Sequence, residues 1–482
     1  MAQRSRAKQV LLAAIMLALA EFLAILIVGP AGAAPPTVSG PVRGGDKGWP
    51  QTAAPQDLPA LGYVEEEFFF AGTAHSYAPK SGTVLGSDGV WQVEPAGAAR
   101  YRTRLLVRRP VDPARFNGTV VVEWLQSHPG AAFDKNVYWI WAHEEILRGG
   151  YAWVGISADR GAVDGHPPDA KDGFPDLVHW DAKRYGSLTI PSEDLGYDIF
   201  TQGARLVGPH RTPAGIDPMG GLKVQRLVSG SASAATARLI SYYNAVQPLE
   251  HLFDGFLLHA RMGTDARPLN LAVKQPDIVQ LRTDQTAPVI VTNTEGEAPR
   301  HFAARQPDGA TYRLWEVTGA PHTNMFWIGW FNRMSERDFG SKPTGCDVPE
   351  DVPSNYVENA ALHALVGWVR DGIAAPHFAP ITIKAGAGPE VERDALGNAK
   401  GGVRLPNVAV PAARFPGRMG CAGSSALLSA AEFNERYGSR EAWLTQFRAA
   451  VADAQQQGYL LPADGEAMLR AAERRQLPMA AR

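Results

Sequence analysis

Two serines in a run of small residues have the setting of a catalytic nucleophile. Residues 225–230 read as a short apolar strand, residues 231–235 are all Ser or Ala, and a helix-like segment follows. A serine nucleophile on a sharp strand-to-helix turn needs small neighbours two positions before and after it, hence the usual Gly-x-Ser-x-Gly pattern. Ser231 and Ser233 both fit such a turn, with Ser and Ala where glycine is usual. The segment therefore predicts a nucleophile elbow at one of these serines.

Carboxylates and a histidine follow later strands of the chain. A nucleophilic serine needs a histidine to take its proton, and that histidine needs a carboxylate to hold its tautomer and stabilise its charge. Residues 287–293 are apolar and β-branched and are followed by Glu295 and Glu297. Residues 312–317 have the same character and precede His322. The order serine, acid, histidine is that of the α/β-hydrolases.

Several segments resemble a family known only as alpha/beta hydrolase domain proteins, exported bacterial proteins of largely undefined substrate. The similar segments recur from about residue 55 to the C-terminus, at 116–125, 148–157, 184–188, 197–200, 238–246 and 315–322. Together they form a specific signal. The resemblance implies an α/β-hydrolase fold, with a doubly wound, mostly parallel sheet, cap-like insertions and a helical C-terminal extension.

The resemblance also selects one serine. In the family, the nucleophile lies eleven residues before the Asn of a Tyr-x-Asn-Ala run, and counting back from Asn244 gives Ser233. Ser231 then stands at the place of the family's glycine and remains the alternative nucleophile. In the same register, His322 is the general base.

Two glutamates compete for the role of the acid. Hydrolases of this fold commonly place the acid nine residues after the proline that opens its strand, and nine residues after Pro288 is Glu297. Glu297 also matches the Asp of the family's Glu-Thr-Asp run, whereas Glu295 matches the Glu of that run. The resemblance thus implies a triad of Ser233, His322 and Glu297, with Glu295 as the alternative acid.

The oxyanion that forms during acyl transfer needs two N–H donors, one after the nucleophile and one in the loop after an earlier strand. The first is Ala234, and the second is Gln126 or Ser127, which follow the strand expected at 119–125. Family members tend to have Asn at the place of Gln126. His259 closes another expected strand and has two interpretations, a residue that faces the site or a satisfied edge histidine.

These residues predict a carboxylic ester hydrolase with an acyl-serine intermediate, a small-molecule ester as substrate and no metal or organic cofactor. The alternative is a catalytically weak or inactive binding protein on the same scaffold, because Ser231 and Ala235 depart from the family's elbow. The 482-residue chain has a net charge of −2 and shows no basic patch, zinc spacing or phosphate-binding glycine loop. That composition argues against a nucleic-acid partner.

The N-terminus has the order of an export signal. Basic residues within 4–8 precede an apolar run at 10–28 and an Ala-x-Ala site that ends at Ala33. We expect cleavage after Ala33 and an exported protein, periplasmic or secreted, without a stable membrane partner. The alternative is an uncleaved anchor, which Glu21 in the middle of the run disfavours. Cys346 and Cys421 are the two cysteines, and in an oxidising compartment they predict a disulfide.

The rest of the chain organises around the expected sheet. A Pro/Gly-rich linker at 34–58 precedes a hydrolase domain at 59–482. Within that domain we expect a β-rich start, two cap-like insertions and a helical tail, at 59–118, 158–196, 323–356 and 430–482. Aromatic residues in the second insertion are consistent either with a substrate pocket or with packing of a cap on the core.

Overall fold

The computed structural model describes residues 35–128, 131–165, 174–213, 215–263, 266–342, 351–386, 388–419 and 425–478. The chain divides into two units, Met1–Pro35 and Pro36–Arg482, and the sheet and its helices belong to the second. The expected signal at 1–33 and both Cys346 and Cys421 lie outside the described residues. Within the described ranges, no helix has the length and apolar character needed to cross a membrane.

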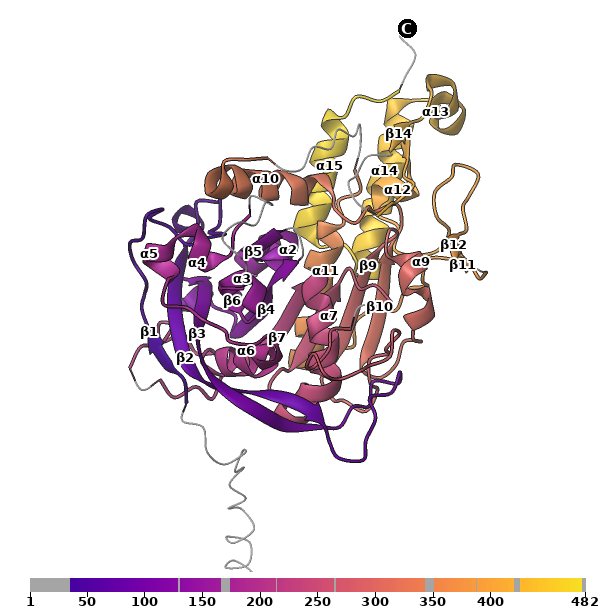
Figure 1. Cartoon of the computed structure of the whole chain (residues 1–482). Helices are drawn as coiled ribbons and strands as arrows, with labels where there is room; N and C mark the ends of the chain where they lie inside the picture. Colours follow the sequence, from indigo (N-terminus) through magenta and orange to yellow (C-terminus); the bar gives the residue numbers. More distant parts are fainter. Residues whose placement is uncertain are drawn as a thin grey trace, which may run out of the picture. The chain divides into compact units, whose positions relative to one another are not determined.

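A mixed, mostly parallel sheet forms the centre of the second unit (Figure 1). Its order is β1-β2-β3-β6-β4-β7-β8-β9-β10, with β5 paired to β4. From β6 to β10 neighbouring strands are parallel, whereas β1, β2, β3 and β5 pair antiparallel. The strands are β1 Thr37–Ser39, β2 Tyr63–Pro79, β3 Val93–Pro110, β4 Thr119–His128, β5 Ala131–Lys135, β6 Ala152–Ser157, β7 Arg226–Ala232, β8 Gly255–His259, β9 Val289–Thr294 and β10 Tyr312–Val317. This topology confirms the predicted α/β fold with a mostly parallel sheet.

Helices follow most of the parallel strands, as the doubly wound fold implied by the resemblance requires. They are α2 Val137–Arg148, α3 Arg160–Val163, α4 Leu177–Trp180, α5 Ala182–Tyr185, α6 Gly196–Arg205, α7 Ala234–Ser241, α8 Gln247–Glu250, α9 Ala298–His301, α10 Met325–Phe339, α11 Asn355–Asp371, α12 Pro406–Ala409, α13 Ala430–Tyr437, α14 Arg440–Gln457 and α15 Pro462–Arg474. Short turns of other helix types are η1 Pro59–Leu61, η2 Pro113–Arg115, η3 Glu193–Leu195, η4 Tyr242–Val246 and η5 Phe302–Ala304. Two small hairpins pair β11 Ile383–Lys384 with β12 Glu390–Val391, and β13 Ala413–Arg414 with β14 Ala426–Leu427.

The sheet separates two hydrophobic cores because successive side chains of a strand point to opposite faces. In β4, Val120 and Val122 pack with Phe200 of α6 and other residues of one core. Val121, between them, lies in the other core with Trp139 of α2 and residues of α11. Both faces of β4 are therefore buried, which explains its continuous β-branched sequence.

The first N–H groups of helix α2 donate to a buried carboxyl group. Glu123 of β4 is 1% exposed and accepts hydrogen bonds from the backbone N–H groups of Tyr138 at 2.7 Å and Trp139 at 2.8 Å. It also accepts one from the indole N–H of Trp153 at 3.0 Å. Burial raises the pKa of Glu123 to about 8, although these hydrogen bonds and Arg108 oppose the rise. The carboxyl oxygens of Glu123 thus satisfy N–H groups that a helix start leaves unpaired.

The C-terminal residues form a helical extension, as predicted. Helix α13 opens with a capping box in which the Ser429 hydroxyl accepts from the Glu432 backbone and the Glu432 carboxylate accepts from the Ser429 backbone. Helix α15 is tied to α2 by Arg148, which donates to both carboxylate oxygens of Asp464, at 2.5 and 2.7 Å. A paired charge of this geometry holds one orientation of the tail against α2.

The aromatic residues of α10 mostly pack the interior. Trp330 and Phe331 are buried in the core that contains α2 and α11. Trp327 is half-buried and packs against a small cluster that includes Trp141 and Ala232, the residue before Ser233. Of the two interpretations of this segment, packing accounts for Trp330 and Phe331; Trp327 packs against the same core and also lies beside the elbow.

Candidate active site

The candidate residues all follow the carboxyl ends of neighbouring parallel strands. Ser233 comes directly after β7, Glu297 follows β9, and His322 follows β10, in the sheet order β7-β8-β9-β10. The ends of parallel strands meet at one edge of a sheet, where ligands bind in open α/β folds. The remaining strand, β8, ends at His259, which lies between the serine and the acid.

Ser233 lies on a strained turn between β7 and α7. Its φ of 57° and ψ of −125° are unusual for a residue with a side chain. Such a conformation costs about 1–3 kcal/mol and persists only where surrounding contacts impose it. Here the N–H of Ser233 donates to the carbonyl of His259 at 3.1 Å, and its carbonyl accepts from the N–H of Thr236 at 2.9 Å. The first of these bonds ties the elbow, which follows β7, to the last residue of β8, and the second closes the turn into α7.

Ser231 has a different environment. It is fully buried, and its hydroxyl is 3.0 Å from that of Thr236, which itself donates to the His259 carbonyl at 2.7 Å. Gly230, in β7 just before Ser231, packs closely against α2, and an added Cβ there would lie 2.3 Å from the ring of Tyr138. Position 230 therefore requires glycine, whereas Ser231, which occupies the family's glycine place, carries a side chain.

His322 and Glu297 lie together. The Nδ1 of His322 is 2.5 Å from Oε1 of Glu297, which is fully buried. The other carboxylate oxygen, Oε2, accepts from Thr294, from its N–H at 2.8 Å and from its hydroxyl at 2.6 Å. With both oxygens used, the carboxylate has one orientation and holds the Nδ1 proton of the imidazole, so that Nε2 is the free ring nitrogen.

The pairing shifts the pKa of both groups. Burial acts to lower the pKa of His322, but the hydrogen bond and charge of Glu297 outweigh burial and raise that pKa above its ordinary value. Burial acts to raise the pKa of Glu297, but the hydrogen bond and charge of His322, with the Thr294 hydroxyl, outweigh it and lower that pKa. The pair therefore favours an ionised carboxylate beside a histidine that accepts a proton readily.

Glu295 has other partners. Its Oε2 accepts from the N–H of Gly319 at 2.8 Å, in the loop before His322, and its Oε1 forms an ion pair with Arg393 at 2.8 Å. Burial raises the pKa of Glu295, with Arg393 and Gly319 opposing the rise. The two glutamates that the sequence leaves as alternatives thus contact different parts of the histidine loop, Glu297 the imidazole and Glu295 the backbone.

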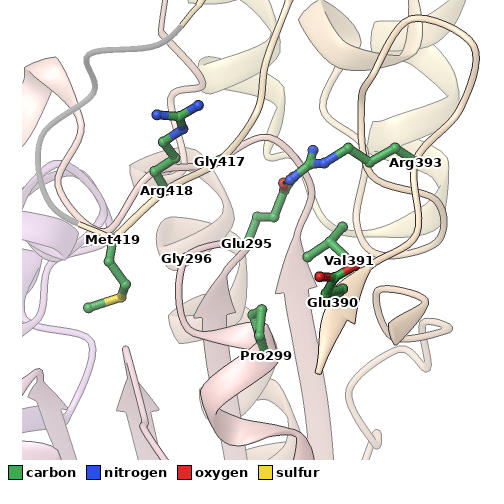
Figure 2. A pocket seen from close by; sticks show the side chains of 9 residues that line it. All are labelled: Glu295, Gly296, Pro299, Glu390, Val391, Arg393, Gly417, Arg418 and Met419. Carbon is green, nitrogen blue, oxygen red and sulfur yellow. Dashed lines mark ion pairs between the residues drawn. The ribbon is translucent and has the colours of Figure 1, made fainter. Parts of the chain in front are cut away.

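A pocket of about 390 Å³ lies beside Glu295 and Arg393 (Figure 2). In Figure 2 the guanidinium of Arg393 meets the Glu295 carboxylate, while the Arg418 side chain points away from that pair. The carbonyl of Arg418 accepts from the N–H of His322 at 3.0 Å. The lining residues are Glu295, Gly296, Pro299, Glu390, Val391, Arg393, Gly417, Arg418 and Met419. One lining residue, Arg418, therefore binds the backbone of His322, and the walls of the pocket contain both signs of charge.

The predicted oxyanion donors differ in their partners. Within the described residues the N–H of Ala234 has no acceptor. The next N–H, that of Ala235, donates to Oε1 of Gln126, which is 4% exposed. The N–H of Ser127 donates to Oδ2 of Asp159 at 3.1 Å and so is already engaged.

His259 is buried rather than open to the site. It is 1% exposed, and its Nδ1 lies 2.7 Å from Oε1 of Glu358 in α11 and 3.1 Å from the hydroxyl of Thr292. Its carbonyl holds the elbow, as described for Ser233. Sequence reasoning misses Glu358 and also Thr294 and Asp159, because their roles depend on neighbours in space and they carry no motif.

The described residues hold no group of three or more His, Cys, Asp or Glu side chains arranged to bind a metal ion. They also contain no hydrogen bond between Ser233 Oγ and His322, a contact that is often long in a hydrolase without substrate.

A mostly parallel sheet with Ser233 on a strained turn after β7, Glu297 after β9 and His322 after β10 has the arrangement of the α/β-hydrolase class. The sequence profile of the family described as Alpha/beta hydrolase domain matches residues 38–470, and the chain belongs to this family. No curated protein matches the chain by sequence.

Solved structures with likeness to the chain include three esterases. The esterase Est22 has 12% identity over 58% of this chain and 77% of its own, with a TM-score of 0.31. The methylesterase BT1017 has 12% identity over 70% of this chain and 58% of its own, with a TM-score of 0.30. A thermostable esterase from Pseudomonas putida has 12% identity over 51% of this chain and 67% of its own, with a TM-score of 0.27.

Proposed function

We propose that this protein is a serine hydrolase that cleaves carboxylic esters, with Ser233 as nucleophile, His322 as general base and Glu297 as the acid. The observation that carries the proposal is the 2.5 Å contact between His322 Nδ1 and the buried Glu297, beside a serine with φ of 57° at the end of β7. Backbone strain of this kind concentrates at functional sites. The substrate is a small-molecule ester, and the esterase names of the similar structures agree with that choice.

The reaction follows from the roles of these groups. Oγ of Ser233 attacks the ester carbonyl carbon while its proton passes to Nε2 of His322, and Glu297 stabilises the imidazolium. The tetrahedral intermediate then collapses: the C–O bond to the alcohol breaks, and the alcohol leaves with the proton from His322. Water attacks the acyl-serine in the same way and releases the carboxylic acid and free Ser233.

The environments of the alternatives support these choices. Ser231 is fully buried and its hydroxyl pairs with Thr236, whereas Ser233 is half-buried on the turn. Glu295 is occupied by Gly319 and Arg393, whereas Glu297 contacts the imidazole. A nucleophile has to reach the substrate, and the acid has to reach the base.

The second candidate function is a catalytically weak or inactive binding protein on the same scaffold. Two observations favour it, the serine at position 231 where the family has glycine and the absence, in the described residues, of a hydrogen bond from Ser233 to His322. Turnover separates the two functions, because a binding protein would retain a ligand without releasing an alcohol.

We also propose that the protein is exported, on the order of basic start, apolar run and Ala-x-Ala site in the sequence. N-terminal sequencing of the purified protein should begin at or near Ala34. Recovery of an intact Met1 in the membrane pellet would instead mean an anchor.

The test of the hydrolase proposal is turnover of p-nitrophenyl esters of increasing acyl length. Wild-type protein should release p-nitrophenol, and His322→Ala should lose on the order of 10³-fold or more in kcat, the scale of a disabled triad. Arg448→Ala, an exposed change on α14, is the matched control and should keep the wild-type rate. Ligand retention without any p-nitrophenol release from the wild-type protein would favour the binding protein.

A further inference from the structure

The peptide between His259 and Ala260 supports the elbow. Its carbonyl accepts from the N–H of Ser233 at 3.1 Å and from the hydroxyl of Thr236 at 2.7 Å. Its N–H, on Ala260, donates to the carbonyl of Thr292 in β9 at 2.8 Å. A peptide unit is planar, so a rotation that moves the carbonyl also moves the N–H. The elbow therefore depends on the orientation of a single peptide at the end of β8.

Backbone strain is concentrated around this peptide. In the described ranges, four residues other than glycine have a positive φ: Thr52, Ser233, His251 and Ala260. Two of them adjoin the His259 carbonyl: Ser233, with φ of 57°, donates to it, and Ala260, with φ of 55°, is the next residue in the chain. Such conformations persist only where surrounding contacts impose them. The contacts that hold His259 therefore also bear on the turn of Ser233.

The side chain of His259 is enclosed by three elements. Its Nδ1 lies 2.7 Å from Oε1 of Glu358, in the first turn of α11, and 3.1 Å from the hydroxyl of Thr292 in β9. Its ring packs against Trp141 of α2, with the ring centroids 4.7 Å apart. His259 is 1% exposed and Glu358 is fully buried. The imidazole is thus fixed from β9, α2 and α11, and neither side chain reaches a substrate.

The Glu358 carboxyl group has one partner in the part of the chain that the structure describes. There, neither of its oxygens accepts a hydrogen bond from any other group, and His259 is its one ion-pair partner. Apolar residues of similar volume can often replace such a buried pair without loss of stability. Stability alone therefore does not account for the pair, and its place beside the elbow points to positioning.

We propose that Glu358 and His259 are positioning residues for Ser233. Glu358 fixes the imidazole, the imidazole fixes the peptide between His259 and Ala260, and that peptide holds the N–H of the nucleophile. The inference rests on the proposed ester hydrolysis and adds to it two buried residues. A displacement of about 1 Å at a reacting group can cost about 10²-fold in rate. Loss of the pair should therefore lower kcat and leave KM nearly unchanged, because the contacts to substrate remain.

Paired substitutions separate positioning from stability. Glu358→Leu and His259→Phe should each lower kcat for p-nitrophenyl esters by about 10²-fold, with KM within about threefold of wild type. The double variant replaces the pair by apolar side chains, so its melting temperature should exceed that of His259→Phe, which leaves the carboxyl group buried and unpaired. Its kcat should stay as low as that of the single variants. Glu358→Gln keeps an oxygen beside Nδ1 and should retain kcat within about threefold.

Leu365→Ala is the matched control on the same helix. Leu365 is buried two turns further along α11, and its side chain packs against Gly255 at the start of β8 rather than against His259 at the end. The cavity left by this substitution should lower the melting temperature. Because the elbow is untouched, kcat should remain within about threefold of wild type.

The rate of fluorophosphonate labelling at saturating probe is a readout that a merely structural role would not move, because it reports the chemical step on Ser233. It should fall together with kcat in Glu358→Leu and in the double variant. The inference is overturned if both proteins keep kcat and labelling within about threefold while Ser233→Ala is inactive, or if kcat recovers in the double variant together with its melting temperature. If Ser233→Ala itself keeps wild-type turnover, the hydrolase mechanism and this inference both fail.

Discussion

Replacement of Glu297 by glutamine should remove most of the catalytic rate without removing the fold. The amide has nearly the size of the carboxylate, but it carries no charge and keeps a single acceptor oxygen. Two residues compete for that oxygen: His322 through Nδ1–H, which lies 2.5 Å from Oε1 of Glu297, and Thr294 through its N–H and hydroxyl, which lie 2.8 and 2.6 Å from Oε2. If Thr294 retains the oxygen, the amide NH₂ faces Nδ1 and stabilises the wrong tautomer of His322.

The expected fall in kcat follows from the loss of the Glu297 charge and of the correct His322 tautomer. A triad with its carboxylate replaced by an amide loses about 10⁴-fold in kcat, and 10³–10⁴-fold corresponds to roughly 4–5.5 kcal/mol of transition-state stabilisation. We expect Glu297→Gln to fall in this range in a steady-state p-nitrophenyl ester assay, with circular dichroism unchanged. Removal of a catalytic charge should alter kcat more than KM.

Glu295→Gln is the matched comparison, two residues away on the same loop. Its carboxylate binds Gly319 and Arg393 rather than the imidazole, so we expect a loss of less than about tenfold in kcat together with reduced stability from the weakened ion pair. A loss of 10³-fold in Glu295→Gln, with Glu297→Gln near wild type, would refute the assignment and move the acid by two residues.

Three further predictions concern protons and cysteines. kcat/KM should rise with pH as His322 loses its proton, with an apparent pKa above the ordinary 6.5, and Glu297→Gln should move that limb to lower pH; a limb that stays in place would contradict the pairing. The native protein retains a proton on Glu123 between its ordinary pKa of 4.5 and its raised value of about 8, so stability should fall as pH rises through this window. Denaturant unfolding at pH 5 and pH 8 should show a smaller fall in Glu123→Gln, and equal falls would contradict it. Cys346 and Cys421 in exported protein should resist alkylation until reduced, since closure of a loop of about 75 residues contributes roughly 4 kcal/mol; two reactive thiols without reductant would exclude the disulfide.

The sequence predicts the sheet well because its strands are buried on both faces. The runs at 119–125 and 287–293 correspond to β4 Thr119–His128 and β9 Val289–Thr294, and their β-branched residues have few alternatives to a buried strand. The helix-like segment after the two serines is less regular: α7 ends at Ser241 and a π-helical turn follows at Tyr242–Val246. A π turn has no strong sequence signature.

The site is less predictable than the sheet. In the sequence only the spacing from Pro288 and the family register favour Glu297 over Glu295, whereas in the structure the two differ in their partners, His322 and Gly319, which lie in a separate loop. The amide of Gln126 is likewise oriented by Ala235, more than a hundred positions away. Such pairings depend on which strand ends lie side by side, and that is decided by the whole sheet.

Covalent labelling of Ser233 tests the central claim most directly. A fluorophosphonate reacts with an activated serine, and mass spectrometry of peptides locates the adduct. We expect one adduct on Ser233 in the wild-type protein, the same adduct in Ser231→Ala, and none in Ser233→Ala or His322→Ala. An adduct on Ser231 in the Ser233→Ala protein, or a wild-type protein that stays unlabelled, would contradict the account.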